Sequence, residues 1–209
     1  MSKIVSKLFL VSILIILSAC APKRVEVPSY EGVDVGDALS ARKNIFAIDT
    51  TFSITFEKED TEIKGEGVAN ISRSGDMNMR LYSFGFLAFE LSSVNGIVKS
   101  SPAVDKNKAL ILTYGLRDCL FWWDIKDFEK REQEGNFILT NSQRRIWIDG
   151  KTMLPVRQVI SLEDGKELNI SYENPDKIGG SWYPSKIRIE LSRYAVTLRI
   201  KDMAFLSEN

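Results

Sequence analysis

The sequence predicts a mainly β (α+β) fold, in which a strongly curved antiparallel sheet is accompanied by an N-terminal helix and a short helical lid. From residue 46 onward, apolar and polar residues alternate with a period of two in one segment after another. Turn dipeptides such as Asn95-Gly96 and Asp149-Gly150 separate these segments. Two regions have the residue spacing of a helix. Two short helical regions are too few to cover the apolar face of roughly ten strands. The sheet must therefore curl around on itself.

The first 19 residues predict an export signal that precedes a lipidation site. A basic segment with two lysines is followed by an apolar stretch at residues 8–16, and small residues precede Cys20. The apolar stretch is shorter than the roughly 20 residues that a spanning helix needs. The pattern resembles the lipobox of bacterial lipoproteins, and an ordinary secretory signal with an accidental cysteine is the alternative. We expect a signal peptide at residues 1–19, a lipidated tether at 20–33 and one folded domain at 34–209.

The composition excludes several classes of function. Without the two lysines of the signal, the chain has 26 basic and 28 acidic residues, a balance that argues against nucleic acid as a partner. The chain has no histidine, which removes histidine-assisted nucleophilic triads and imidazole metal sites. Cys119 is expected to be buried, with a reactive thiol as the alternative. We predict no enzyme activity, no catalytic residue, no cofactor and no metal site.

Two regions are predicted to be helical. Asp34 or Asp37 can cap a short helix that ends near Lys43. Apolar residues recur at steps of three and four between residues 105 and 123, which favours a helix that Gly115 bends or divides. A strand at residues 108–114 is the alternative. The three aromatic residues at 121–123 predict either burial on more than one side or an aromatic lid over an apolar opening.

The strand at residues 63–71 has an unusual apolar face. Gly65 and Gly67 stand where large side chains are expected, so the middle of this face is almost bare. Glycine in a strand marks strong curvature or the close approach of another group. The glycines therefore predict either room for a ligand or a sheet that bends around its own core. The strands at residues 186–191 and 196–201 each combine one polar and one apolar face.

The most informative loop contains Phe84, Gly85, Phe86 and Leu87. Hairpin loops are normally polar, and three large apolar residues around a turn glycine are exceptional. Such residues either fold inward or meet a hydrophobic partner such as a bilayer or an acyl chain. We interpret this loop as a candidate site of membrane or acyl-chain insertion.

Several stretches of the chain together resemble a known family. They are Arg80-Leu81-Tyr82-Ser83-Phe84-Gly85, Phe89-Glu90-Leu91, Asn95-Gly96, the helical stretch from Leu116 to Trp123, and Trp182-Tyr183-Pro184-Ser185-Lys186-Ile187. With the lipidated N-terminus, this pattern is similar to LolB-type outer-membrane lipoproteins of the LolA/LolB lipoprotein-localisation superfamily. The resemblance covers about residues 34–205. It implies an incomplete β-barrel with a helical lid, whose cavity accepts the acyl chains of lipoproteins.

The resemblance also assigns roles to particular residues. LolB-type proteins carry an exposed leucine followed by glycine in an early loop, and Phe84-Gly85 occupies the similar place. Ala21 after the lipidated cysteine resembles the residue choice that directs lipoproteins to the outer membrane, here on its periplasmic face. A periplasmic LolA-like carrier is an implied partner. The candidates for the cavity or its lid are Gly65, Gly67, Leu116, Leu120, Trp122 and Trp123.

Two functional hypotheses follow. The first is a lipid-anchored envelope protein that binds acyl chains of lipoproteins or lipids in an apolar cavity and delivers them to the outer membrane. The second is a structural or assembly lipoprotein of the envelope, in which the barrel is solidly packed and the apolar loop docks onto a protein. An acyl-chain carrier requires an open apolar cavity, whereas a solid interior favours the second hypothesis.

Overall fold

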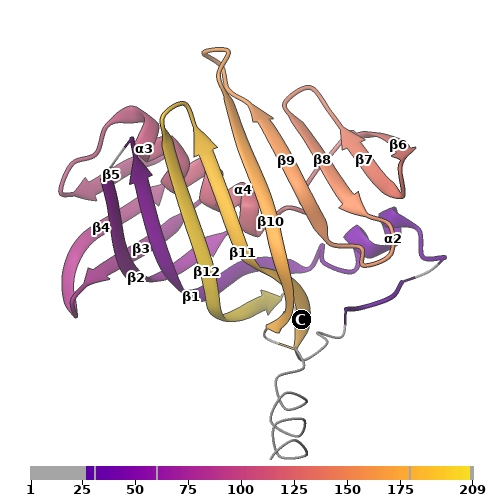
Figure 1. The fold of residues 1–209 in the computed structure, drawn as a ribbon, viewed down its shortest axis with the longest axis horizontal. Helices are drawn as coiled ribbons and strands as arrows, with labels where there is room; N and C mark the ends of the chain where they lie inside the picture. The colour runs from indigo at the N-terminus through magenta and orange to yellow at the C-terminus, as the bar shows by residue number, and fades with distance from the viewer. Residues whose placement is uncertain (1–26, 31, 60, 179, 208–209) are drawn as a thin grey trace, which may run out of the picture.

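The computed structural model of the chain describes residues 27–30, 32–59, 61–178 and 180–207. The predicted signal peptide and Cys20 lie outside the described residues. Twelve antiparallel strands form one sheet in the order β5-β4-β3-β2-β1-β12-β11-β10-β9-β8-β7-β6 (Figure 1). The strands are β1 (Ile45–Lys58), β2 (Thr61–Ser72), β3 (Met77–Ser83), β4 (Phe86–Val94), β5 (Ile97–Ser101), β6 (Glu129–Gln133), β7 (Asn136–Thr140), β8 (Arg144–Asp149), β9 (Pro155–Ser161), β10 (Glu167–Ile178), β11 (Ser181–Leu191) and β12 (Tyr194–Ser207).

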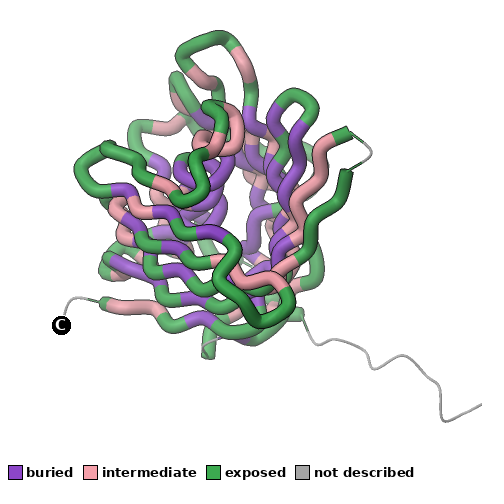
Figure 2. Tube along the Cα trace, turned by 90° about the vertical axis from the view of Figure 1, so that its left-hand side faces the viewer, coloured by how far each residue is buried: buried purple, intermediate pink, exposed green. Residues whose placement is uncertain are grey.

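The sheet curls into an incomplete barrel. The first strand, β1, pairs along its length with the last strand, β12, while β5 and β6 are the two ends of the sheet order and do not pair with each other. Buried residues lie on the inside of the curl and exposed residues on the outside (Figure 2). The predicted curved antiparallel sheet is confirmed. It has two strands more than the roughly ten that alternation indicated, including the charged β6, whose residues are all exposed.

Gly67 shows how the sheet bends around its own side chains. In the pairing of β1 with β2, Gly67 lies opposite Phe52. A Cβ atom on Gly67 would lie 2.3 Å from Cε2 of Phe52 and 2.9 Å from Cδ2 of Leu81. Real Cβ atoms do not make contacts this short, so any larger residue at this position would displace the Phe52 ring and the Leu81 side chain. At this position the bare face of β2 is covered by neighbouring side chains of the same sheet.

The helices are short and lie where the sequence predicts them. Helix α2 (Val35–Ser40) is capped by Asp34, whose Oδ1 accepts a hydrogen bond of 2.7 Å from the Gly36 amide. A second helical segment consists of α3 (Lys106–Leu110), a π-helical turn η1 (Ile111–Gly115) and α4 (Leu116–Leu120). The alternative strand at residues 108–114 is therefore wrong. Gly115 lies at the junction of η1 and α4, where an added Cβ would lie 3.0 Å from the Ile189 side chain.

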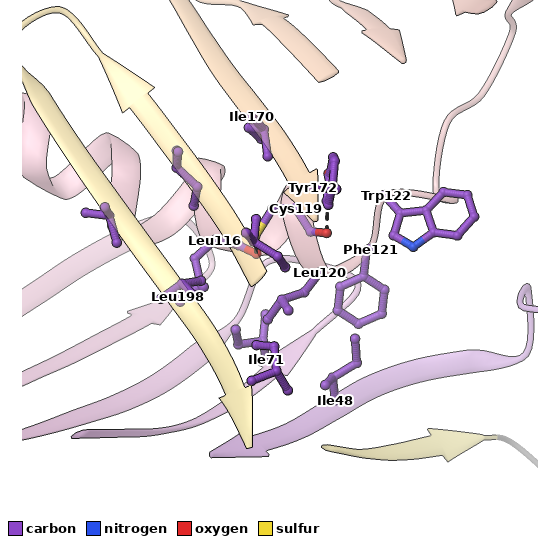
Figure 3. Packing of buried hydrophobic residues seen from close by; sticks show 14 of the residues in the cluster. Ile48, Ile71, Leu116, Cys119, Leu120, Phe121, Trp122, Ile170, Tyr172 and Leu198 are labelled. Atoms are coloured by element: carbon purple, nitrogen blue, oxygen red, sulfur yellow. Dashed lines mark hydrogen bonds between the residues drawn. The ribbon is translucent and has the colours of Figure 1, made fainter. Parts of the chain in front are cut away.

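The helical segment packs into the concave face of the sheet and completes the core (Figure 3). Phe121, Trp122 and Trp123 are all buried. This is possible because α4 ends at Leu120, and Phe121 has the non-helical backbone angles φ −98° and ψ 46°. The three rings therefore leave the helix in different directions. The structure agrees with burial on more than one side and differs from an exposed aromatic lid.

Candidate functional site

Helix α4 is fastened to the sheet by buried hydrogen bonds. The hydroxyl of Tyr183 donates to the Leu120 carbonyl at 2.7 Å, and the hydroxyl of Tyr172 lies 3.4 Å from the Cys119 carbonyl. These carbonyls come at the end of the helix, where they lack partners within it. Burial raises the pKa of both tyrosine hydroxyls well above 10, so they remain protonated donors.

Arg144 holds the chain just beyond α4. Its guanidinium donates to the carbonyls of Trp122 and Asp124, at 3.2 and 2.9 Å, and to Oε1 of Gln158 at 3.0 Å. Both Arg144 and Gln158 are buried polar residues. Removing one member of such a buried network leaves its partners without hydrogen bonds. The position of the aromatic cluster is thus fixed by polar contacts as well as by packing.

The predicted lid residues Leu116, Leu120, Trp122 and Trp123 belong to this packed region. All four are buried in the core, and none of them lines the apolar pocket described below. Cys119 is also buried, as expected, and burial raises the pKa of its thiol well above the ordinary value of 9.0. A protonated, inaccessible thiol is a poor nucleophile. This part of the interior is a core.

An apolar pocket of about 330 Å³ lies in the other half of the concave face. It is bounded by β1–β4 on the sheet side and by the segment from Pro102 to Leu112 on the helix side. This volume is within the range of about 300–1,000 Å³ for small-molecule pockets. Its wall includes Ile54, Phe56, Leu81, Phe89, Val104 and Leu112.

Gly65 forms part of the pocket wall, whereas Gly67 does not. A Cβ on Gly65 would lie 2.7 Å from the backbone carbonyl oxygen of Tyr82 in the neighbouring segment. The two glycines of β2 therefore differ: Gly67 makes room for the Phe52 ring, and Gly65 permits a close approach of backbone beside the pocket. Sequence reasoning identified both positions but could not separate their roles.

The hairpin that connects β3 to β4 carries an exposed apolar tip, which we define as Phe84, Phe86 and Leu87. Their exposed fractions are 99%, 78% and 55%. The inward packing that the sequence left open is not adopted. Because Tyr82 and Ser83 on one side of the tip, and Ala88 and Phe89 on the other, line the pocket, the apolar tip projects from the pocket's rim.

The turn at the apolar tip uses an unfavourable residue. Phe84 and Gly85 have φ values of 49° and 81°, and Asn95 and Gly96 in the next hairpin have almost the same values, 51° and 77°. Two-residue turns with positive φ at both positions favour Asn-Gly. A bulky residue at positive φ is disfavoured. Phe84 therefore has a strained backbone conformation, although its side chain packs against almost nothing else in the protein.

Sequence reasoning missed the helix-side wall of the pocket. Residues 102–104 were not singled out because a short loop with a proline has no periodic pattern. The sequence pattern places Lys108 only in a helix or, alternatively, a strand, yet Lys108 lines the pocket and its Nζ lies 5.0 Å from the centre of the Phe56 ring. No spacing rule links Phe56 to Lys108, since their proximity arises from the folding of the helical segment onto the sheet.

Other kinds of site have little support in the part of the chain that the structure describes. No group of three or more acidic or cysteine side chains there is arranged to hold a metal ion. Within the same residues, no helix has the length and apolar character to span a membrane. A larger groove, of about 750 Å³, includes Phe84 and Gly85 at the apolar tip and shares Gly65 and Tyr82 with the pocket wall. Another, of about 480 Å³, is lined by both polar and apolar residues, among them Asp49, Val68 and Glu90.

Comparisons with known proteins support the architecture. No protein-family model matches the sequence, and no curated protein matches it. A LolA superfamily protein from Nitrosomonas europaea matches with a TM-score of 0.52 at 13% identity, over 85% of this chain and 96% of the other. A DUF1329 family protein from Desulfovibrio piger matches with a TM-score of 0.52 at 10% identity, over 86% and 94%. The likeness establishes that this chain has the LolA-like curved-sheet fold.

Proposed function

We propose that this chain is a lipid-anchored, non-enzymatic envelope protein that binds acyl chains of lipoproteins or lipids and delivers them to the outer membrane. One observation carries the proposal: the apolar pocket and the exposed apolar tip are built by the same β3–β4 hairpin. A chain leaving the pocket would pass directly to whatever the tip contacts. The LolA-like fold, which is a binding fold, is consistent with this role.

The apolar tip is suited to a hydrophobic environment. Burying a large apolar side chain contributes about 1.5–3 kcal/mol. Insertion of Phe84 and Phe86 into a bilayer would therefore outweigh the strain of the positive φ at Phe84, which costs about 1–3 kcal/mol. The tip gains this energy only when a membrane or an acyl chain is present.

The proposed anchor is compatible with the position of the apolar tip. Tyr30, near the tether, donates its amide hydrogen to the Lys151 carbonyl, at the end of the sheet opposite the β3–β4 turn. Because Tyr30 is held there, the tether that precedes it is the ten residues from Cys20 to Ser29, which can reach about 33 Å when extended. The 14 residues of β1 span about 46 Å at the same rise per residue. The tip can therefore meet the membrane that holds lipidated Cys20 when the strands tilt toward that membrane, and in an upright domain it faces away from it, toward a LolA-like carrier.

The pocket can be tested with a chain that starts at Ala21, which retains every described element. Native mass spectrometry of this chain, purified gently from cells, is expected to show a bound acyl-chain mass, and added fluorescent fatty acid is expected to bind. Ala88→Trp places an indole at an exposed position of the pocket wall and should prevent uptake. Ala204→Trp, on an exposed position of β12, is the matched control. Failure of the unsubstituted chain to bind any acyl chain would refute the proposal.

Membrane delivery can be tested separately from binding. Phe84→Glu is expected to abolish liposome flotation of the loaded protein while uptake in the pocket persists. Ile97→Glu changes another exposed apolar residue, at the opposite end of β4, and should float like the unsubstituted protein. If the Phe84→Glu variant floats with liposomes and transfers its acyl chain normally, the apolar tip has no part in membrane delivery.

A structural or assembly lipoprotein is the second candidate, because the half of the interior around Trp122 is solidly filled. In that role the apolar tip would dock onto a protein partner, and the pocket would be unused. Ala88→Trp would then leave cells unaffected, whereas Phe84→Glu would abolish co-purification of one partner. If Ala88→Trp instead impairs the cells, the result supports the acyl-chain carrier function.

A further inference from the structure

The apolar pocket has at its wall a cationic group that forms no ion pair with a carboxylate of the described residues. Of the charged residues that line it, Lys64 pairs with Glu62 at 2.5 Å. Lys108 has no carboxylate oxygen within 4.0 Å among the described residues, and its Nζ lies over the Phe56 ring at 5.0 Å. A cation–π contact at an accessible site is weak. The ammonium group of Lys108 is therefore available to a stronger, negatively charged partner.

The acidic residue closest to Lys108 in the sequence is already engaged. Oδ1 of Asp105 accepts the backbone amide of Lys108 at 3.1 Å and caps α3, while its Oδ2 accepts the Tyr194 hydroxyl at 3.1 Å. Both oxygens of Asp105 are thus engaged by groups other than the Lys108 ammonium. Lys108 is also partly buried, which limits its contact with water. An anion held there would form a charge-assisted hydrogen bond.

The volume of the pocket limits the number of hydrocarbon chains. An engineered cavity of about 150 Å³ holds one benzene molecule, which is about 25 Å³ per carbon atom. The same allowance places about 13 carbon atoms in the 330 Å³ of this pocket. One acyl chain fits this space, and two or three chains of ordinary length exceed it.

We infer that the ligand is a single-chain amphiphile with an anionic head, whose chain lies in the pocket and whose head lies on Lys108. The shared chemistry is that of a fatty-acid carboxylate or a lysophospholipid phosphodiester. This inference rests on the proposed function and narrows it from acyl chains in general to one class. It differs from a triacylated lipoprotein cargo in both chain number and the need for a negative charge.

Calorimetric titration of the chain from Ala21 can test the inference with three twelve-carbon probes below their micelle concentrations: dodecanoate, 1-dodecanol and lauroyl-lysophosphatidylglycerol. At least one anionic probe is expected to bind about tenfold more tightly than the alcohol. Binding of dodecanoate alone, of the lysophospholipid alone or of both would show whether the anionic head is a fatty-acid carboxylate, a phosphodiester or either one. Affinity should rise with chain length up to about 13 carbons and then level off.

Variants of Lys108 separate charge from packing. Lys108→Gln should weaken the binding of the anionic probes about tenfold and leave the affinity for 1-dodecanol unchanged. Lys108→Arg, which keeps the positive charge, should retain most of the affinity for the anionic probes. Lys99→Gln removes an exposed lysine outside the pocket and is the control. Thermal melting of each variant verifies folding.

The outcomes distinguish the inference from the proposed function. Equal affinity for dodecanoate, the lysophospholipid and 1-dodecanol would overturn the inference that the ligand has an anionic head, while the proposed carrier function would stand. Equally tight binding of a two-chain phosphatidylglycerol would overturn the inference that the ligand has a single chain. Binding of no probe would refute both the inference and the proposed function.

Discussion

The two ends of the internal helical segment behave differently although they are continuous in the chain. Four of the five residues of α4 are buried, and buried tyrosine hydroxyls fasten its last carbonyls. None of the residues of α3 is buried, and α3 bounds the pocket. The π-helical turn η1 lies between them. The contrast places a packed core in one half of the concave face and the apolar pocket in the other.

The largest expected effect comes from breaking the packed half. Trp122→Ala removes one of the largest buried side chains and should lower the free energy of unfolding by about 3–5 kcal/mol. Phe86→Ala, the matched truncation at the 78% exposed apolar tip, should change it by less than about 0.5 kcal/mol. Urea denaturation followed by circular dichroism measures both. Similar losses for the two variants would contradict the division into a packed and an open half.

A smaller loss is expected from removing one hydroxyl that holds α4. Tyr183→Phe leaves the Leu120 carbonyl without its 2.7 Å hydrogen bond and should cost about 1–3 kcal/mol of unfolding free energy. Tyr114→Phe makes the same change at an exposed residue of η1 and should cost almost nothing. Denaturation in urea compares the pair directly. Equal stability of both variants would mean that packing alone holds α4 in place.

The packed half should also make the protein sensitive to alkaline pH. Burial raises the pKa of Cys119, Tyr172 and Tyr183 above their ordinary values of 9.0 and 10.0. Above pH 9 the unfolded chain loses these protons while the native protein keeps them, so stability falls as pH rises. Each group contributes a slope of up to about 1.4 kcal/mol per pH unit. Denaturation between pH 8 and 11 should show a shallower decline for Tyr183→Phe than for Tyr114→Phe; equal slopes would argue against the buried hydroxyl.

The smallest expected effect concerns the open half and has the opposite sign. Phe84→Asn places in the tip the residue that its positive φ favours, and should stabilise the protein by about 0.5–1 kcal/mol while weakening liposome binding. Asn95→Phe is the reciprocal change in a turn of nearly the same conformation and should destabilise by a similar amount. Thermal melting and flotation measure the two effects. Loss of both stability and liposome binding in Phe84→Asn would show that Phe84 is a structural residue.

Much of the fold could be predicted because its signals are local. Alternation identified the closing strands, and Ile187 pairs with Leu198 and Ile189 with Val196 on their buried face, as their period indicates. The site was only partly predictable. The apolar tip and Gly65 stood out because their residue types are unusual for a hairpin loop and a strand. The other half of the pocket did not, since the wall at Val104 and Lys108 belongs to a loop and a short helix without a distinctive pattern.

By itself, the sequence determined the curved antiparallel sheet, the short helix before β1 and the two-residue turns, because backbone preference and hydrophobic period act over a few residues. Only the tertiary structure decided which apolar residues became core and which became pocket wall. Leu116 and Leu112 have the same helical spacing, yet the first lies in the core and the second also lines the pocket. The difference arises from the distance between the helical segment and the curved sheet, which depends on the packing of side chains far apart in the sequence.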